Sequence, residues 1–333
     1  MVPPGSESAA LEILTDFVRK VRACADEAGK RVGRRILLAH RVPSRLESCF
    51  DAGYDVPAWA RMGMADMLTL SSWSADILPN ARIWRAVLPP ETVLNLCTED
   101  ACVRPYPGSV ISNYDILAGN VAAAFENGFD NFYFFNDCYR EGDSHKEYQE
   151  YLRQIGSPEG LSQMLRRIPV TAPLRYPGSD QRGVLPVPLK QSAEGCDFAR
   201  MEQNISFKFP YAGACGDSYL SVGFSNDAVQ SSLDSMTARM NGVPLERTKR
   251  PALRGCTLRP SFVKEAPQDV AFFLTWKIPA GTLHPGGNVA ELLPDPVEGR
   301  IVWAEIMVPP YESGNGRKDW RETATEKKRD VVF

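Results

Sequence analysis

The sequence predicts two regions of different fold class, a parallel α/β region followed by an all-β region. Up to about residue 165, helical and strand patterns alternate four times. After about residue 168, proline and glycine separate short alternating runs, and no helical pattern lies between them. A chain of 333 residues is long enough for about two domains. We therefore expect domains at 1–166 and 167–312, and a polar C-terminal tail at 313–333.

Periodicity locates the elements of the first region. Apolar residues recur at three- and four-residue steps from 9 to 29, which predicts an amphipathic helix that ends at Gly29. The apolar run at 35–42 predicts the first buried strand, and 44–62 a helical or looped crossover. The remaining expected elements are strands at 66–70, 92–98 and 131–135 and helices at 79–88 and 112–127. Strands that alternate with helices should pair in parallel through right-handed crossovers.

Short strand runs define the second region. They lie at 205–209, 219–224, 235–240, 259–263, 271–279, 289–293 and 301–308. Asn241-Gly242 within this series is a strong signal for a tight hairpin turn. Strands that follow one another without intervening helices are typical of an antiparallel sandwich.

Composition narrows the range of functions. A formal net charge of −3 argues against a nucleic-acid partner. No apolar stretch is long enough to predict a membrane span, and the first residues lack the features of a secretory signal. A cytoplasmic location is therefore the default unless an upstream segment is missing. The 8 cysteines form no CxxC pair and the 3 histidines stand far apart, so we expect no metal site, no cofactor, and chemistry that depends on carboxylates.

Several sequence segments resemble a known family. They are Arg41–Pro43, Gly53–Trp59, Gly63–Leu68 and Asn127–Asn136. Together they are similar to the C-terminal half of the (β/α)8 barrel in bacterial glycoside-hydrolase-like proteins, the glycosyl hydrolase 10-like and related barrels. In such proteins a β-sandwich often follows, and its Asn-Gly hairpin and Pro-Gly-Gly-Asn segment match Met240–Gly242 and Pro285–Val289 here. The resemblance implies a half TIM-type barrel, strands five to eight, followed by a jelly-roll-like sandwich.

The number of strands departs from that family. A complete barrel has eight strands and about 250 residues, whereas only four predicted strands precede the sandwich. A half barrel leaves two sheet edges unpaired, which favours association of the chain with itself. We therefore expect a homo-oligomer formed through the open edges, or else a truncated product of a larger gene.

Glu99 is the first candidate catalytic residue. Barrel enzymes place their chemistry at the C-terminal ends of the strands, and Glu99 follows the third predicted strand. The resemblance implies that this strand corresponds to strand seven, which ends in the nucleophile. Hydrolysis needs a second carboxyl group, which Asp137, Asp100 or a second chain would have to supply. Alternatively, Glu99 begins a solvated loop and Asp137 caps a turn.

Candidate substrate-binding residues occupy the same strand ends and loops. They are Arg41, Trp73, Arg104, Tyr106 and Asn136. The Arg41 guanidinium could hold a sugar hydroxyl or orient Glu99, or it could form a structural ion pair with Asp66 or Glu99. Trp73 could stack on a pyranose ring or pack in the core. Cys97 is expected in the core, off the face that lines the barrel.

The expected ligand is carbohydrate. One hypothesis is a glycoside hydrolase that acts on poly- or oligosaccharide through the strand-end carboxylate, or an inactive remnant of one. The alternative is a non-catalytic carbohydrate-binding or structural protein. Neither hypothesis includes a nucleic acid or a membrane as partner.

Overall fold

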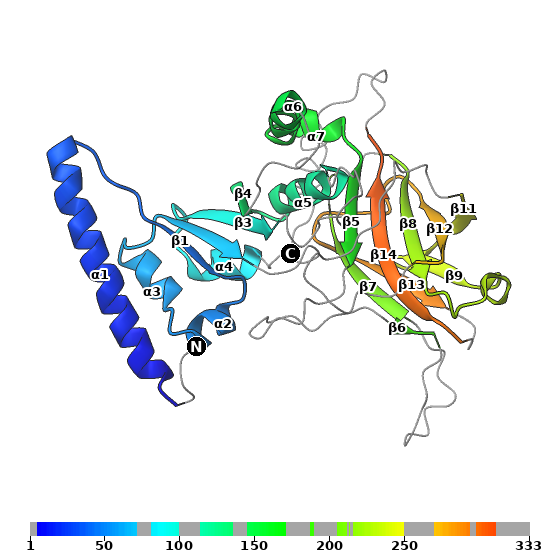
Figure 1. Cartoon of the computed structure of the whole chain (residues 1–333), viewed down its shortest axis with the longest axis horizontal. Helices are drawn as coiled ribbons and strands as arrows, with labels where there is room; N and C mark the ends of the chain where they lie inside the picture. The colour runs from blue at the N-terminus through cyan, green and yellow to red at the C-terminus, as the bar shows by residue number, and fades with distance from the viewer. Residues whose placement is uncertain are drawn as a thin grey trace.

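The structure, a computed structural model, describes residues 5–71, 81–99, 114–135, 145–170, 187–189, 205–211, 213, 216–249, 270–293 and 298–310. Within these ranges a parallel β/α region is followed by two antiparallel sheets that contact each other (Figure 1). The predicted fold class, α/β followed by all-β, is therefore confirmed.

Four parallel strands form the first sheet in the order β1-β2-β3-β4. The strands are β1 Ala39–Pro43, β2 Met67–Ser71, β3 Val93–Glu99 and β4 Asn131–Phe135. The helices are α1 Glu7–Val32, α2 Leu46–Asp51, α3 Val56–Arg61, α4 Ala81–Val87, α5 Tyr114–Glu126, α6 His145–Ile155 and α7 Pro158–Ser162. Among the helices in the described ranges, none is both long and apolar enough to cross a bilayer.

All the helices that precede β3 pack on one face of this sheet. Leu68, Leu70 and Leu94 are fully buried on that face, in a core shared with side chains of α1, α2, α3 and α4. Helices on a single face, with strands in sequential order and no reversal, are the arrangement of consecutive units of a β/α barrel. A doubly wound sheet would instead reverse its strand order and carry helices on both faces. The predicted half barrel is confirmed in its strand order and in the placement of its helices.

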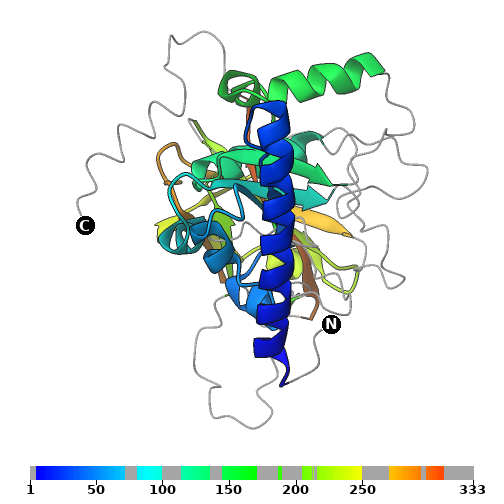
Figure 2. The same cartoon turned by 90° about the vertical axis from the view of Figure 1, so that its left-hand side faces the viewer.

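Two predicted boundaries are wrong, for identifiable reasons. Helix α1 continues past Gly29 to Val32 and ends at Gly33, whose φ of 70° is left-handed. Gly29 instead allows a close approach, since a Cβ there would lie 2.7 Å from the carbonyl oxygen of Arg34. The first strand begins at Ala39 rather than 35, because side chains bond the preceding backbone: Arg22 donates to the carbonyl of Ile36 and Asp66 accepts from the N–H of Leu38. Figure 2 shows α1 lying along the outside of the parallel region.

The second region is a sandwich of two antiparallel sheets. One has the order β10-β9-β13-β7, and the other has the order β11-β12-β8-β14-β5, with β6 also paired to β14. The strands are β5 Arg166–Val170, β6 Val187–Pro188, β7 Ile205–Pro210, β8 Ser218–Phe224, β9 Thr237–Met240, β10 Val243–Pro244, β11 Glu246–Thr248, β12 Phe272–Ile278, β13 Gly287–Leu293 and β14 Arg300–Val308. Phe207 and Leu292 of the first sheet share one core with Leu220, Trp276 and Ile306 of the second. The run at 259–263 lies outside the described residues.

The predicted Asn-Gly turn is confirmed and has a second role. Met240 pairs with Val243 across a two-residue loop, in which Asn241 and Gly242 have φ of 53° and 80°. The side chain of Asn241 also donates to Oδ1 of Asn288 at 2.8 Å and accepts from the N–H of Val289 at 2.9 Å. The two sandwich segments that carry the family resemblance therefore contact each other.

Helix α5 joins the two regions. Leu117 and Ala122 belong to the core of the sandwich, whereas Ala124 belongs to the core of the parallel region. The helix passes close to β5 at Gly119, where a Cβ would lie 2.1 Å from the carbonyl oxygen of Arg167. The absence of a side chain at Gly119 thus sets the distance between α5 and the sandwich.

Gly119→Ala should lower the free energy of unfolding by roughly 1–3 kcal/mol, as overpacking does, although alanine favours helix formation. The matched control is Gly287→Ala, because a Cβ at Gly287 would meet nothing within 4 Å. Chemical denaturation of both variants measures the difference. Equal stability of the two variants would show that α5 and β5 separate at little cost.

Candidate functional site

The face of the parallel sheet opposite the helices is polar. Arg41, Thr69, Asn95 and Asn131 lie side by side in register on β1 to β4. They alternate along the strands with the buried leucines of the helix side, since successive strand residues point to opposite faces. In a β/α barrel this second face lines the interior, and its C-terminal ends form the site.

Side-chain hydrogen bonds link neighbouring strands on this polar face. Arg41 Nε donates to Ser71 Oγ at 3.0 Å, which connects the C-terminal ends of β1 and β2. Asn95 Nδ2 donates to Thr69 Oγ1 at 3.2 Å, which connects β2 to β3. The Asn95 side chain is buried, and its Oδ1 has no hydrogen-bond partner in the part of the chain that the structure describes. The face thus carries an exposed arginine and a buried amide oxygen.

Glu99 is the last residue of β3, one residue beyond the predicted end of this strand at 98, and its backbone lies opposite Phe135 of β4. The other three strands end in Pro43, Ser71 and Phe135, so Glu99 is the carboxyl residue among the four described strand ends. The side chain of Glu99 lies outside what the structure describes, and so do all of Asp137, Trp73, Arg104, Tyr106 and Asn136. Their predicted roles remain predictions.

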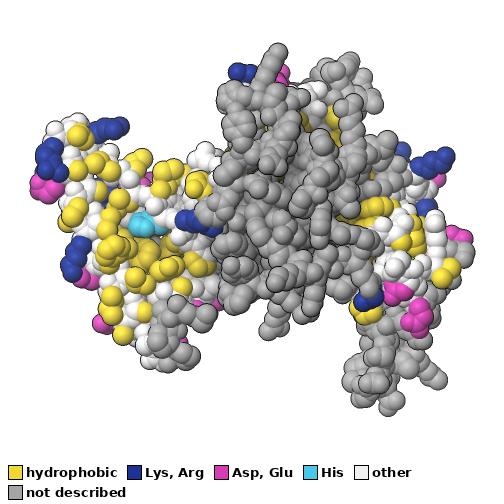
Figure 3. Space-filling model, in the orientation of Figure 1, with side chains coloured by type: hydrophobic (Ala, Val, Ile, Leu, Met, Phe, Trp, Pro, Cys, Tyr) yellow, Lys and Arg dark blue, Asp and Glu magenta, His cyan; other side chains and the backbone are white. Residues whose placement is uncertain are grey.

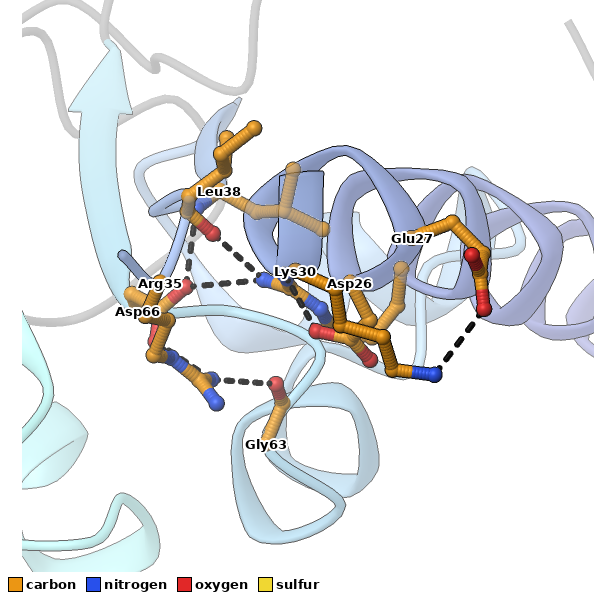
Figure 4. Close-up of polar contacts among 9 residues, drawn as sticks. Asp26, Glu27, Lys30, Arg35, Leu38, Gly63 and Asp66 are labelled. Atoms are coloured by element: carbon orange, nitrogen blue, oxygen red, sulfur yellow. Dashed lines mark hydrogen bonds and ion pairs between the residues drawn. The ribbon is translucent and has the colours of Figure 1, made fainter. Parts of the chain in front are cut away.

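The alternative partner considered for Arg41, an ion pair with Asp66, is not formed. Asp66 precedes β2 and therefore lies at the opposite end of that strand from Ser71. Its Oδ1 accepts two hydrogen bonds from Arg35, at 2.7 and 3.1 Å. Its Oδ2 accepts from the N–H of Leu38 at 2.8 Å and from Arg22 at 3.4 Å (Figure 4). Asp66 thus holds α1 and the start of β1 to β2.

Cys97 is buried as predicted, but its expected position off the polar face is wrong. It lies two residues after Asn95 and two before Glu99 in a strand without a bulge, in register with Ser71 and Tyr133. It therefore shares the polar face with Asn95. His40 lies on the helix side, where its Nε2 is 2.9 Å from the carbonyl oxygen of Met64 and its ring packs near Trp59. His40 is a structural residue in this arrangement.

A buried charged cluster at the junction of the two regions was not predicted. The guanidinium of Arg167 donates to Oε2 of Glu305 from Nε at 2.8 Å, and Nη2 lies 2.7 Å from the same oxygen. Both side chains are at most 1% exposed, so no substrate reaches them. Burial raises the pKa of the nearby Asp115 carboxyl, Arg167 opposes this rise, and Glu305 adds to it. The sequence signal was a glutamate inside the apolar run at 301–308.

Among the described residues, no group of three or more histidine, cysteine, aspartate or glutamate side chains is placed to hold a metal ion. The residues described above differ between the start of β2 and the polar face of the sheet. Charged residues at the start of β2 hold neighbouring segments together, and polar side chains of β1 to β3 lie on the face opposite the helices.

Asp66→Ala should lower the free energy of unfolding by roughly 2–3 kcal/mol, because it removes charge-assisted hydrogen bonds from a mostly buried arginine. Asp16→Ala is the control, since Asp16 pairs with Arg19 and Lys20 on the exposed side of α1 and should change stability by less than about 1 kcal/mol. Urea titration of both variants gives the comparison. Similar losses would contradict the role given to Asp66.

Asp115 should make stability depend on pH. A carboxyl whose pKa is raised in the folded state binds protons there more readily than in the unfolded chain. Stability should then fall as pH rises from the ordinary aspartate pKa, near 3.8, through the raised folded pKa. Asp115→Asn should remove this part of the slope and be more stable than the wild type above that range. Denaturation across the range tests this, and parallel curves for the two proteins would contradict it.

A scan against protein-family models found no match, and neither did a search of curated proteins. What agrees with the resemblance is architecture alone: an N-terminal parallel β/α region is followed by antiparallel sheets.

Proposed function

We propose that the chain is a glycoside-hydrolase-like protein that takes up poly- or oligosaccharide at the polar face of its parallel sheet, with Glu99 as the catalytic carboxylate. The observation that carries the proposal is the position of Glu99 at the C-terminal end of β3. Glu99 follows on its strand from Asn95, the adjacent strand β2 ends in Ser71, and Arg41 of β1 is hydrogen-bonded to Ser71. Carboxylate chemistry of barrel enzymes is found at such strand ends.

The polar groups suit a saccharide ligand. Arg41 is exposed while its Nε is fixed by Ser71, so a guanidinium held in one orientation is presented at the strand ends. A guanidinium with several N–H donors can hold two oxygen acceptors at once, which adjacent sugar hydroxyls supply. In this proposal Trp73, Arg104, Tyr106 and Asn136 provide further contacts to the sugar.

Hydrolysis places two demands on carboxyl groups. One must protonate the glycosidic oxygen while the other attacks the anomeric carbon or activates water. The proposal gives Glu99 the second task and Asp137, which follows β4 in the sequence, the first. The glycosidic oxygen takes the proton of the acid and leaves with its sugar. Water then supplies the hydroxyl group on the anomeric carbon.

A second candidate function is carbohydrate binding without cleavage. It is favoured by the observation that Glu99 is the one carboxyl residue at the described ends of β1 to β4, whereas hydrolysis needs a pair. Polar groups that hold sugar hydroxyls would serve binding equally well.

Glu99→Gln separates the two functions. If the chain hydrolyses a saccharide, this change should reduce release of reducing sugar from a polysaccharide panel at least about a hundredfold, because glutamine can neither attack nor accept a proton. Glu91→Gln is the control, since Glu91 is an exposed carboxylate at the opposite end of the same strand. The control should retain wild-type turnover.

The outcomes exclude one another. Loss of turnover in Glu99→Gln alone supports hydrolysis, and equal turnover of both variants removes Glu99 as the catalytic group. If the wild type hydrolyses nothing, calorimetric titration with the same saccharides decides: binding supports the second function. Neither binding nor cleavage across the panel would contradict both.

A further inference from the structure

The parallel sheet ends at two strands that each have a single neighbour. Among the described strands, β1 pairs only with β2, and β4 pairs only with β3. The outer edge of each strand therefore offers a row of backbone donors and acceptors to a further strand. Eight parallel strands close a barrel whose interior side chains fill, and four consecutive strands with helices on one face are half of that arrangement.

Exposed apolar side chains are frequent in the part of the chain that precedes β2. Six of them precede β2 in the sequence, whereas the described part of the sandwich has Val229 and Val243. The six are Ile13, Phe17, Val32, Leu37, Phe50 and Met62, with exposed fractions between 37% and 68%. Figure 3 shows hydrophobic side chains over much of this part of the molecule on the face turned to the viewer. In the edge strand β4, Tyr133 is 44% exposed.

We propose that two copies of this chain close one eight-stranded barrel, with β4 of each copy beside β1 of the other. A two-fold axis along the strands keeps every strand parallel and brings both pairs of open edges together in one step. A single partner that covered only β1 would leave the β4 edge open. A second copy covers both edges at once, because each edge is repeated in the partner.

The inference concerns assembly and holds whether or not the chain acts on carbohydrate. In the closed form, the polar face with Arg41 and Asn95 would line a common interior, and the strand ends of both copies would meet at one mouth.

Sedimentation velocity of the full chain tests the proposal. The expected particle has twice the chain mass of 36.9 kDa. The double variant Phe17→Lys/Leu37→Lys should weaken the dimer at least about tenfold, because it places two charges among the exposed apolar side chains that precede β1. Tyr133→Lys should weaken it as well, since closure also uses the β4 edge. Val229→Lys/Val243→Lys is the matched control on the sandwich and should remain dimeric. Circular dichroism and thermal melts check that each variant is folded.

The outcomes are decisive. A wild type that stays monomeric at every soluble concentration overturns the proposal, and so does a Phe17/Leu37 double variant that associates as strongly as the control. If Tyr133→Lys leaves the dimer intact while the double variant breaks it, two β1 edges meet each other and closure between β1 and β4 is wrong. Weakening by both edge variants, with the control unaffected, supports the closed barrel.

Discussion

The close contact between α5 and β5 is the constraint on which the rest of the structure depends. The helix is buried on nearly every side, and its alanines and Gly119 let it lie between two cores. A helix packed on two sides needs small side chains where the backbone of a neighbour approaches, since protein interiors leave no room for an extra methyl group. The position of the parallel sheet relative to the sandwich is fixed through this helix.

Charged and polar residues divide between the two ends of the parallel sheet. At the start of β2, the Asp66 carboxylate accepts hydrogen bonds from two arginines and from the backbone N–H of Leu38, the residue that precedes β1. Farther along the strands, Arg41 and Asn95 make one described side-chain bond each within the sheet, to Ser71 and Thr69. In β/α barrels the two ends of the sheet differ in the same way, since the site lies at the C-terminal ends of the strands.

Local patterns allowed much of the fold to be predicted, and distant contacts explain what was missed. The strand at 131–135 and the Asn241-Gly242 turn depend on neighbouring residues, and both were located from sequence. The Arg167–Glu305 pair joins residues 138 positions apart, so the sequence showed only an unexplained glutamate in an apolar run. For the candidate site, the end of β3 at Glu99 followed from periodicity. The hydrogen bond between Arg41 and Ser71 did not follow from periodicity, because this contact depends on which end of β2 lies beside Arg41.

The shared helix also decides how this chain can be divided. A cut near residue 166, where the sequence suggests a domain boundary, would leave α5 with the first fragment and strip the sandwich of the surface that covers it. The first fragment would expose the apolar side of α5 to solvent, and the sandwich would lose part of its hydrophobic core. Transfer of the sandwich to another protein by gene recombination would therefore have to include α5. The two regions thus form one structural unit.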